Sequence, residues 1–155
     1  PVKIPEPSKL STDFGKHISF RDAVYHSDLE EFLIADGLKG KILKYNPSGN
    51  PEVNKYFDVA FPDSVEPLKT PEGIAVDSEG NIYIADWGLH RILILNSAGS
   101  FVKQIGGIKA WNSVNNQAPN LMFPKRIAIE EDAKGILFKG KRVFREKHIR
   151  YHIFF

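Results

Sequence analysis

Four short apolar runs, separated by polar turn residues, stand out between positions 71 and 107. The runs read GIAV, NIYIAD, RILILN and FVKQI, and the segments DSEG, WGLH and SAGS lie between them. Each run is rich in Ile, Val or Leu, while the intervening segments supply the Gly, Asn, Asp and Ser that tight turns use. The pattern predicts a four-stranded antiparallel meander.

The same pattern occurs earlier in the chain. Residues 32–50 align with residues 82–100 without a gap, and 7 of the 19 aligned positions are identical. A unit of four short strands that repeats after about 40–50 residues is typical of a propeller blade. We therefore expect an all-β fold: a β-propeller built of four-stranded antiparallel blades, about three blades per chain.

The best-formed unit resembles the NHL-repeat family. The resemblance is carried by Pro71 to Asp77 (PEGIAVD), Gly80 to Asp86 (GNIYIAD) and His90 to Ile92 (HRI). The first unit keeps the inner part of this pattern in Ile34 to Asp36. A third unit opens well with FPKRIAIE from Phe123, but it has GILFKGK where the family would have Ala-Asp.

We interpret residues 1–155 as a single NHL-like propeller segment. Residues 1–19 are a lead-in, residues 20–61 the first blade, residues 71–107 the second and residues 123–155 a divergent third. The first blade is expected to close with a strand in KYFDVAF, and the third to contain strands near RIAIE, GILF, KRVF and HIRYHIFF. Pro62 to Thr70 is expected to be a connector between blades.

Charged residues recur at equivalent places in the first two units. Asp36 and Asp86 correspond, and Lys41 and Arg91 follow them by five positions. Because a residue that determines the fold is needed in every repeat and a catalytic residue only once, we expect ion pairs or turn-closing hydrogen bonds here. His90, at the family's His/Asn position, is expected to be a structural turn residue.

Two segments are candidates for binding. Residues 108–122 are polar, rich in Asn and longer than a connector requires, and long loops on a rigid scaffold are frequent binding sites. The candidates there are Trp111, Asn112, Asn115 and Asn116.

The second candidate is the basic end of the chain. Although the net charge is only +2, residues 134–155 carry seven Lys and Arg against one Glu, interleaved with aromatic residues. This mixture can hold nucleic acid through Lys141, Arg142 and Arg145. The alternation of Ile149, Tyr151 and Ile153 with polar residues favours a structural strand instead.

Catalytic and metal-binding motifs are not visible in the sequence. There is no Cys, the five His form no HExxH pair, and no GxSxG motif occurs. We expect no cofactor and no metal. The composition is that of a soluble globular β protein without a signal or membrane-spanning run, and it leaves the compartment open.

Three blades do not close a propeller, since known rings have at least four. We expect the first and last blades to expose one apolar face each, so that a second copy or a partner chain completes the ring. The favoured function is therefore a non-catalytic module for protein or macromolecular binding. Alternatives are a metal-dependent lyase or lactone hydrolase of the six-bladed kind assembled from two chains, and an RNA-binding propeller.

Overall fold

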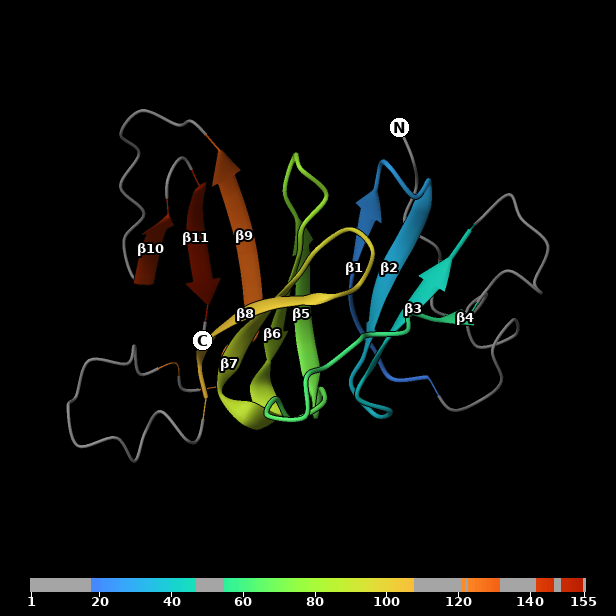
Figure 1. The fold of residues 1–155 in the computed structure, drawn as a ribbon, viewed down its shortest axis with the longest axis horizontal. Coiled ribbons are helices and arrows are strands. Elements are labelled where there is room, and N and C mark those ends of the chain that lie inside the picture. Colours follow the sequence, from blue (N-terminus) through green and yellow to red (C-terminus); the bar gives the residue numbers. More distant parts are fainter. Residues whose placement is uncertain are drawn as a thin grey trace.

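Three antiparallel sheets form an all-β structure, which confirms the predicted fold class (Figure 1). The computed structural model describes residues 18–46, 55–107, 121, 123–131, 142–146 and 149–154. The first sheet consists of β1 (Phe20–His26), β2 (Glu31–Asp36), β3 (Lys41–Tyr45) and β4 (Lys55–Tyr56). The second consists of β5 (Pro71–Val76), β6 (Ile82–Asp86), β7 (Arg91–Leu95) and β8 (Phe101–Gly106). The third consists of β9 (Arg126–Glu131), β10 (Arg142–Glu146) and β11 (Ile149–Phe154).

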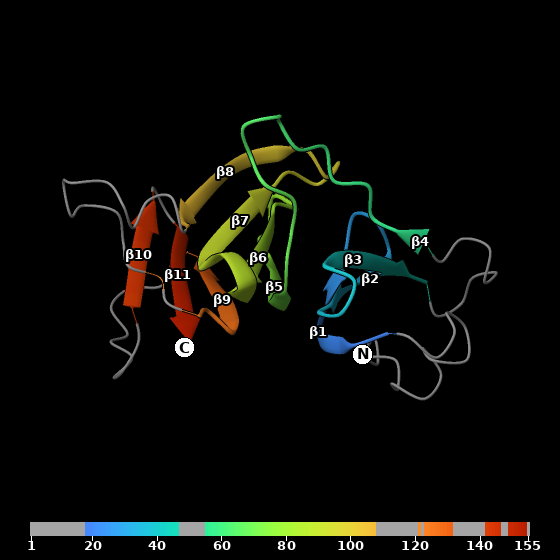
Figure 2. The same cartoon turned by 90° about the horizontal axis from the view of Figure 1, so that it is seen from below.

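The sheets lie side by side in the manner of propeller blades. Sheets one and two have their strands in chain order, as the meander pattern predicts. Their first strands, β1 and β5, are neighbours, and β9 lies on the other side of β5 (Figure 2). On β1, the Asp22 carboxylate accepts a hydrogen bond of 3.2 Å from the Ile74 amide of β5. The strands that begin the three sheets therefore form the common inner side of the assembly.

The second sheet is buried on both faces. One face packs on the first sheet through Ile74, Ile82, Ile84, Leu93 and Leu95, which meet Leu33, Ala35 and Ile42. The opposite face packs on the third sheet through Ala75, Tyr83, Ala85, Ile92 and Ile94, which meet Ile127 and Ile153. Every residue of β6 and β7 is buried. This explains why the four residues after Arg91 in β7, ILIL, are all apolar rather than alternating with polar residues.

The fourth strand of the first sheet is much shorter than the sequence suggests. We expected a strand within KYFDVAF, but β4 contains only two residues, Lys55 and Tyr56. The Phe57 amide still donates to the Ile42 carbonyl, at 2.7 Å, and the chain then leaves the sheet. Ala60 instead forms an isolated parallel bridge with Ser100 at the start of β8. Apolar side chains that pack on both sheets, Phe57, Val59 and Phe61, account for this departure.

The third sheet does not follow chain order. Its order is β10-β11-β9, so the strand in HIRYHIFF is central and pairs with both neighbours. The strands expected near RIAIE, KRVF and HIRYHIFF are all present, but they are not arranged as a meander. Ile153 of β11 is 0% exposed and opposite Ile127 of β9, and both belong to the core shared with sheet two. Packing of these side chains explains why β11 lies next to β9. The GILF segment lies outside the described residues.

The outer face of the first sheet is also different from our expectation. Instead of being an uncovered apolar face, it carries four side chains that are at most 1% exposed: Phe32, Ile34, Leu43 and Tyr45. Ile18, Phe20, Ala23 and Tyr56 pack against them. An apolar surface for a neighbouring blade is therefore absent at these positions.

Gly73 makes the contact between the second and third sheets possible. A Cβ atom at this position would lie 2.6 Å from the Lys125 carbonyl oxygen and 2.8 Å from the Arg126 Cα atom. Both are backbone atoms, which cannot swing aside as a flexible side chain can.

We predict that Gly73→Ala lowers the free energy of unfolding by about 1–3 kcal/mol, the usual cost of overpacking. Gly37→Ala is the matched control, because its Cβ would meet only the flexible Arg21 side chain. Urea unfolding measures both. Equal stabilities of the two variants would show that the sheets do not approach each other in this way.

Candidate functional site

A buried ion pair joins the second sheet to the connector that precedes it. Arg91 Nε donates to Asp86 Oδ2 at 3.1 Å, and the two side chains are 3% and 0% exposed. The Asp86 carboxylate also accepts from the Lys69 and Thr70 amides, at 3.2 and 2.9 Å. The guanidinium donates further to the Glu66 and Pro67 carbonyl oxygens and to the Gln104 side chain. These bonds hold the connector against the ends of β6 and β7.

The corresponding residues of the first sheet make different contacts. Asp36 Oδ1 accepts from the amides of Ser19, Leu38 and Lys39, and its Oδ2 accepts from the Tyr56 hydroxyl at 3.0 Å. Lys41 forms no ion pair with Asp36; its Nζ lies 5.3 Å from the centre of the Tyr56 ring. The alternative of an ion pair is thus wrong for the first sheet, where Asp36 closes the turn by hydrogen bonds.

Tyr56 is the residue that takes the place of a basic partner for Asp36. Burial, the hydrogen bond to Asp36 and the negative charge of Asp36 raise the pKa of the Tyr56 hydroxyl from 10.0 to about 12. No sequence pattern singles out Tyr56, because it lies twenty residues after Asp36 and outside the repeated segment.

His90 connects the second sheet to the beginning of the third. Its backbone is left-handed, with φ of 54°, and its Nδ1 accepts a hydrogen bond of 3.2 Å from the Phe123 amide. The Phe123 ring lies against both His90 and Trp87, with centroid distances of 4.3 and 4.9 Å. We call Trp87, His90 and Phe123 the aromatic surface, since Trp87 is 36% and Phe123 40% exposed.

A buried histidine between the first two sheets was not anticipated. His26, 0% exposed, donates from Nε2 to the Gly80 carbonyl oxygen at 2.9 Å. Because a carbonyl can only accept, Nε2 is the donor in this bond. Among the described residues, Nδ1 has no hydrogen-bond partner. The side chain therefore ties β1 to the turn after β5.

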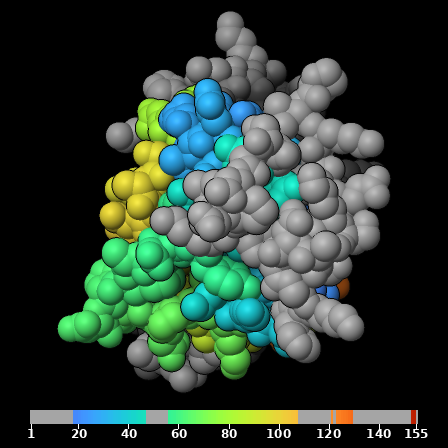
Figure 3. Space-filling view, turned by 90° about the vertical axis from the view of Figure 1, so that its right-hand side faces the viewer, coloured from blue at the N-terminus to red at the C-terminus, as the bar shows by residue number. Residues whose placement is uncertain are grey.

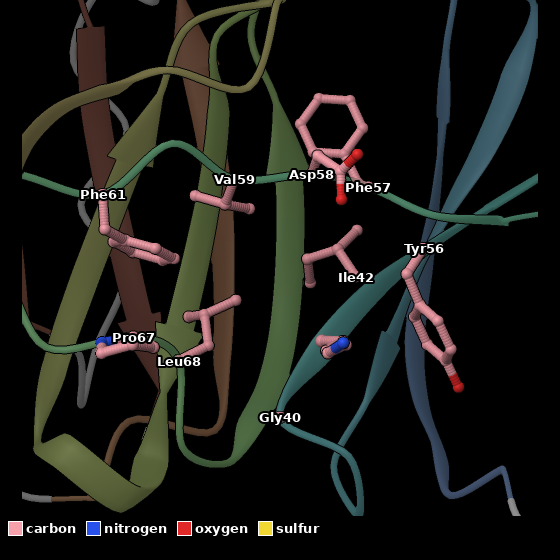
Figure 4. A pocket seen from close by; sticks show the side chains of 10 residues that line it. Gly40, Ile42, Tyr56, Phe57, Asp58, Val59, Phe61, Pro67 and Leu68 are labelled. Carbon is pink, nitrogen blue, oxygen red and sulfur yellow. The ribbon is translucent and has the colours of Figure 1, made fainter.

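A pocket opens between the first sheet and the connector. It has a volume of about 250 Å³, and its lining includes Ile42 of β3, Val59 and Phe61 of the segment that follows β4, and Leu68 of the connector (Figure 4). Figure 3 shows the green residues of the connector beside the cyan residues of the first sheet on this side of the molecule. The sequence analysis did not predict this pocket.

Most of the predicted binding residues fall outside the description of the structure. Trp111, Asn112, Asn115, Asn116 and Lys141 lie outside the described residues. Arg142 and Arg145 belong to β10, of which the backbone alone is described. Their assignment as binding residues stays a prediction.

Neither a metal-binding group nor a membrane-spanning helix occurs among the described residues. Within the described ranges, no group of three or more His, Cys, Asp or Glu side chains is placed to hold a metal ion. Within the same described part of the chain, no helix has the length and apolar character needed to cross a membrane.

We predict that Asp86→Ala lowers the free energy of unfolding by about 3–5 kcal/mol, because it leaves the Arg91 charge buried without its partner. Asp63→Ala, at an exposed position of the connector, is the control and should change stability by less than about 0.5 kcal/mol. Urea unfolding followed by circular dichroism gives both values. If Asp86→Ala has the same free energy of unfolding as the wild-type protein, the recurring aspartate does not stabilise the fold.

Tyr56 gives the stability a dependence on alkaline pH. Its folded-state pKa is raised to about 12 from 10.0, so its contribution is complete below pH 10 and is lost as the pH rises through 12. We predict that the stability advantage of the wild-type protein over Tyr56→Phe shrinks across this interval. Urea unfolding between pH 8 and about 12 measures it, with Tyr25→Phe as the control on β1. An advantage that stays constant with pH would contradict the bond to Asp36.

Comparison with known proteins bears on the second sheet. Residues 68–95, which run from the end of the connector through β5, β6 and β7, match the family model of the NHL repeat. The sequence matches none of the curated proteins with which it was compared. The resemblance inferred from the PEGIAVD, GNIYIAD and HRI segments is thereby confirmed for residues 68–95, which match the NHL repeat.

Proposed function

We propose that this chain is a non-catalytic protein-binding module whose partner docks on the aromatic surface. An NHL repeat indicates a β-propeller-type module of a kind usually involved in protein interaction. The fold alone does not identify a partner. The proposal therefore depends on the side chains that are exposed at the end of the sheets where the aromatic surface lies.

The observation that carries the proposal is the half-exposed pair Trp87 and Phe123. Their rings are in contact and are held in place by the hydrogen bond from the Phe123 amide to His90. Rigid aromatic side chains contribute a large contact area at a small cost in conformational entropy, and they dominate many protein interfaces. The pair also spans two sheets, so a partner there would contact both.

Basic residues lie beside the aromatic surface or follow it in the chain. Lys69 packs on the Gly88 turn, next to Trp87, and Lys125 and Arg126 follow Phe123 and are exposed. A partner with acidic residues around an apolar centre would match this arrangement, since complementary charges favour encounter and orientation.

A further polypeptide, either a second copy or another chain, would continue the arc beyond the third sheet. Propellers have four or more blades, and three sheets are described here. The buried outer face of the first sheet argues against continuation on that side. On β9, Ala128 is exposed and offers a position where another sheet can approach.

Site-specific photo-crosslinking tests both parts of the proposal. A benzophenone amino acid replaces Trp87 for the partner surface, Ala128 for the continuation of the arc, or Val102, 51% exposed on β8, as the control. We predict crosslinks from positions 87 and 128 and few from 102. The crosslinking is done first with the purified protein and then with an extract, so that the mass of each product distinguishes a second copy from another protein.

Crosslinking from position 102 as strong as from position 87 would contradict the partner surface. An absence of products from position 128 in both settings would contradict continuation of the arc.

A further inference from the structure

The inner strands of the three sheets have two positions that can be compared directly. The pattern Pro-x-x-Ile-Ala opens β5 at Pro71 and leads into β9 from Pro124. The strand register extends the comparison to β1, because Asp22 and Gly73 each follow the irregularity that opens β1 and β5. We call the second residue of the pattern the pair position and the third the contact position. The pair position holds Arg21, Glu72 and Lys125, and the contact position holds Asp22, Gly73 and Arg126.

The pair position joins the first two sheets by opposite charges. Arg21 Nε lies 3.3 Å from Glu72 Oε1, so an ion pair links β1 and β5 where the two strands adjoin. Lys125 occupies the same position on the third sheet. It is exposed and takes part in no ion pair within the described part of the chain. Its charge is therefore available to a further neighbour.

The contact position meets the backbone of the following sheet. The Asp22 carboxylate accepts a hydrogen bond of 3.2 Å from the Ile74 amide. Gly73 has no side chain, and a Cβ atom there would lie 2.6 Å from the Lys125 carbonyl oxygen. The third sheet instead carries an exposed Arg126 at this position. Because a guanidinium group donates hydrogen bonds and accepts none, a further neighbour must present acceptors at this point.

The surface around Arg126 is small and apolar where it is described. Ala128 of β9 is exposed, and Phe154 of β11 is half-buried and lies directly opposite Arg126 in the register. Directly opposite residues share one face of a sheet. Ile127, by contrast, is buried against the second sheet. We call the surface that remains on the other side of the third sheet the free face; its described members are Lys125, Arg126, Ala128 and Phe154.

A second copy of the chain does not match the free face. In a head-to-tail contact, β1 of the copy would follow β9, which places Arg21 beside Lys125 at the pair position. The outer face of the first sheet is moreover covered by Ile18 and Phe20. In a contact with twofold symmetry, two free faces would meet, each with the cations Lys125 and Arg126. Because like charges that meet across an interface weaken it, both arrangements are unfavourable.

We propose that the free face binds an acidic polypeptide that is not a second copy of this chain. One carboxylate of the partner pairs with Lys125, as Glu72 pairs with Arg21. A second carboxylate accepts hydrogen bonds from Arg126, and apolar side chains pack beside it. Phosphate groups of a nucleic acid would answer the same cations, but the adjacent apolar area favours a polypeptide. The inference rests on the proposed continuation of the arc and adds the chemistry of the neighbour.

Charge reversal combined with photo-crosslinking tests the inference. The benzophenone amino acid at position 128 is combined with Lys125→Glu and Arg126→Glu, and the purified protein is mixed with an extract. We expect the yield of the product with another protein to fall at least about tenfold, because two attractive contacts become repulsive. Lys39→Glu with Lys41→Glu is the matched control, since it reverses two exposed charges of the first sheet and should leave the yield unchanged.

A carbodiimide examines the same contact without any substitution. This reagent joins an amine directly to a carboxylate with which it is in contact, and it is applied to the wild-type protein in the extract. We expect mass spectrometry to find an isopeptide bond between Lys125 and an Asp or Glu of the partner. Lys39, which is exposed on the first sheet, is the control and should form no bond to the same protein.

The outcomes separate this inference from the proposed function. An undiminished product in the charge-reversed variant would overturn the acidic partner and leave continuation of the arc standing. A product from position 128 with the mass of two copies of this chain, or one that nuclease digestion removes, also overturns it. If position 128 gives no product at all, both fail together. If thermal melts show that the charge-reversed variant is unfolded, the carbodiimide decides, and absence of the bond from Lys125 contradicts the inference.

Discussion

The buried ion pair of Asp86 and Arg91 determines how the chain passes from one sheet to the next. Its partners are mainly backbone groups of the connector, at Glu66, Pro67, Lys69 and Thr70. Two buried charges are stable only when nearly every donor and acceptor is satisfied. The connector must therefore approach the end of the second sheet in one way, which fixes where β5 begins and how the two sheets face each other.

The sequence predicted the second sheet best because its information is local. Four apolar runs and the three polar turns between them are sufficient for a meander, and the structure has it in the expected order. The third sheet could not be predicted in the same way. Its strand order depends on the pairing of Ile153 with Ile127, which lie 26 positions apart in the chain. It also depends on the packing of both residues on the second sheet, and a local sequence pattern contains no information on such contacts.

The functional surfaces were less accessible from the sequence than the fold. His90 was recognised as a turn residue, but its hydrogen-bond partner Phe123 lies 33 positions further along the chain, which no local pattern indicates. The pocket results from a strand that stops at Tyr56 although KYFDVAF has the composition to continue.

The complete burial of β6 and β7 has a consequence for how the chain is made. These strands need cover from both sides, and the two covers come from opposite directions along the sequence. The first sheet has already left the ribosome when RILIL emerges, whereas Ile153 emerges much later. The face of β6 and β7 that packs on the third sheet therefore lacks its native neighbour for part of synthesis. During that interval this apolar face is exposed to contacts that the finished fold prevents.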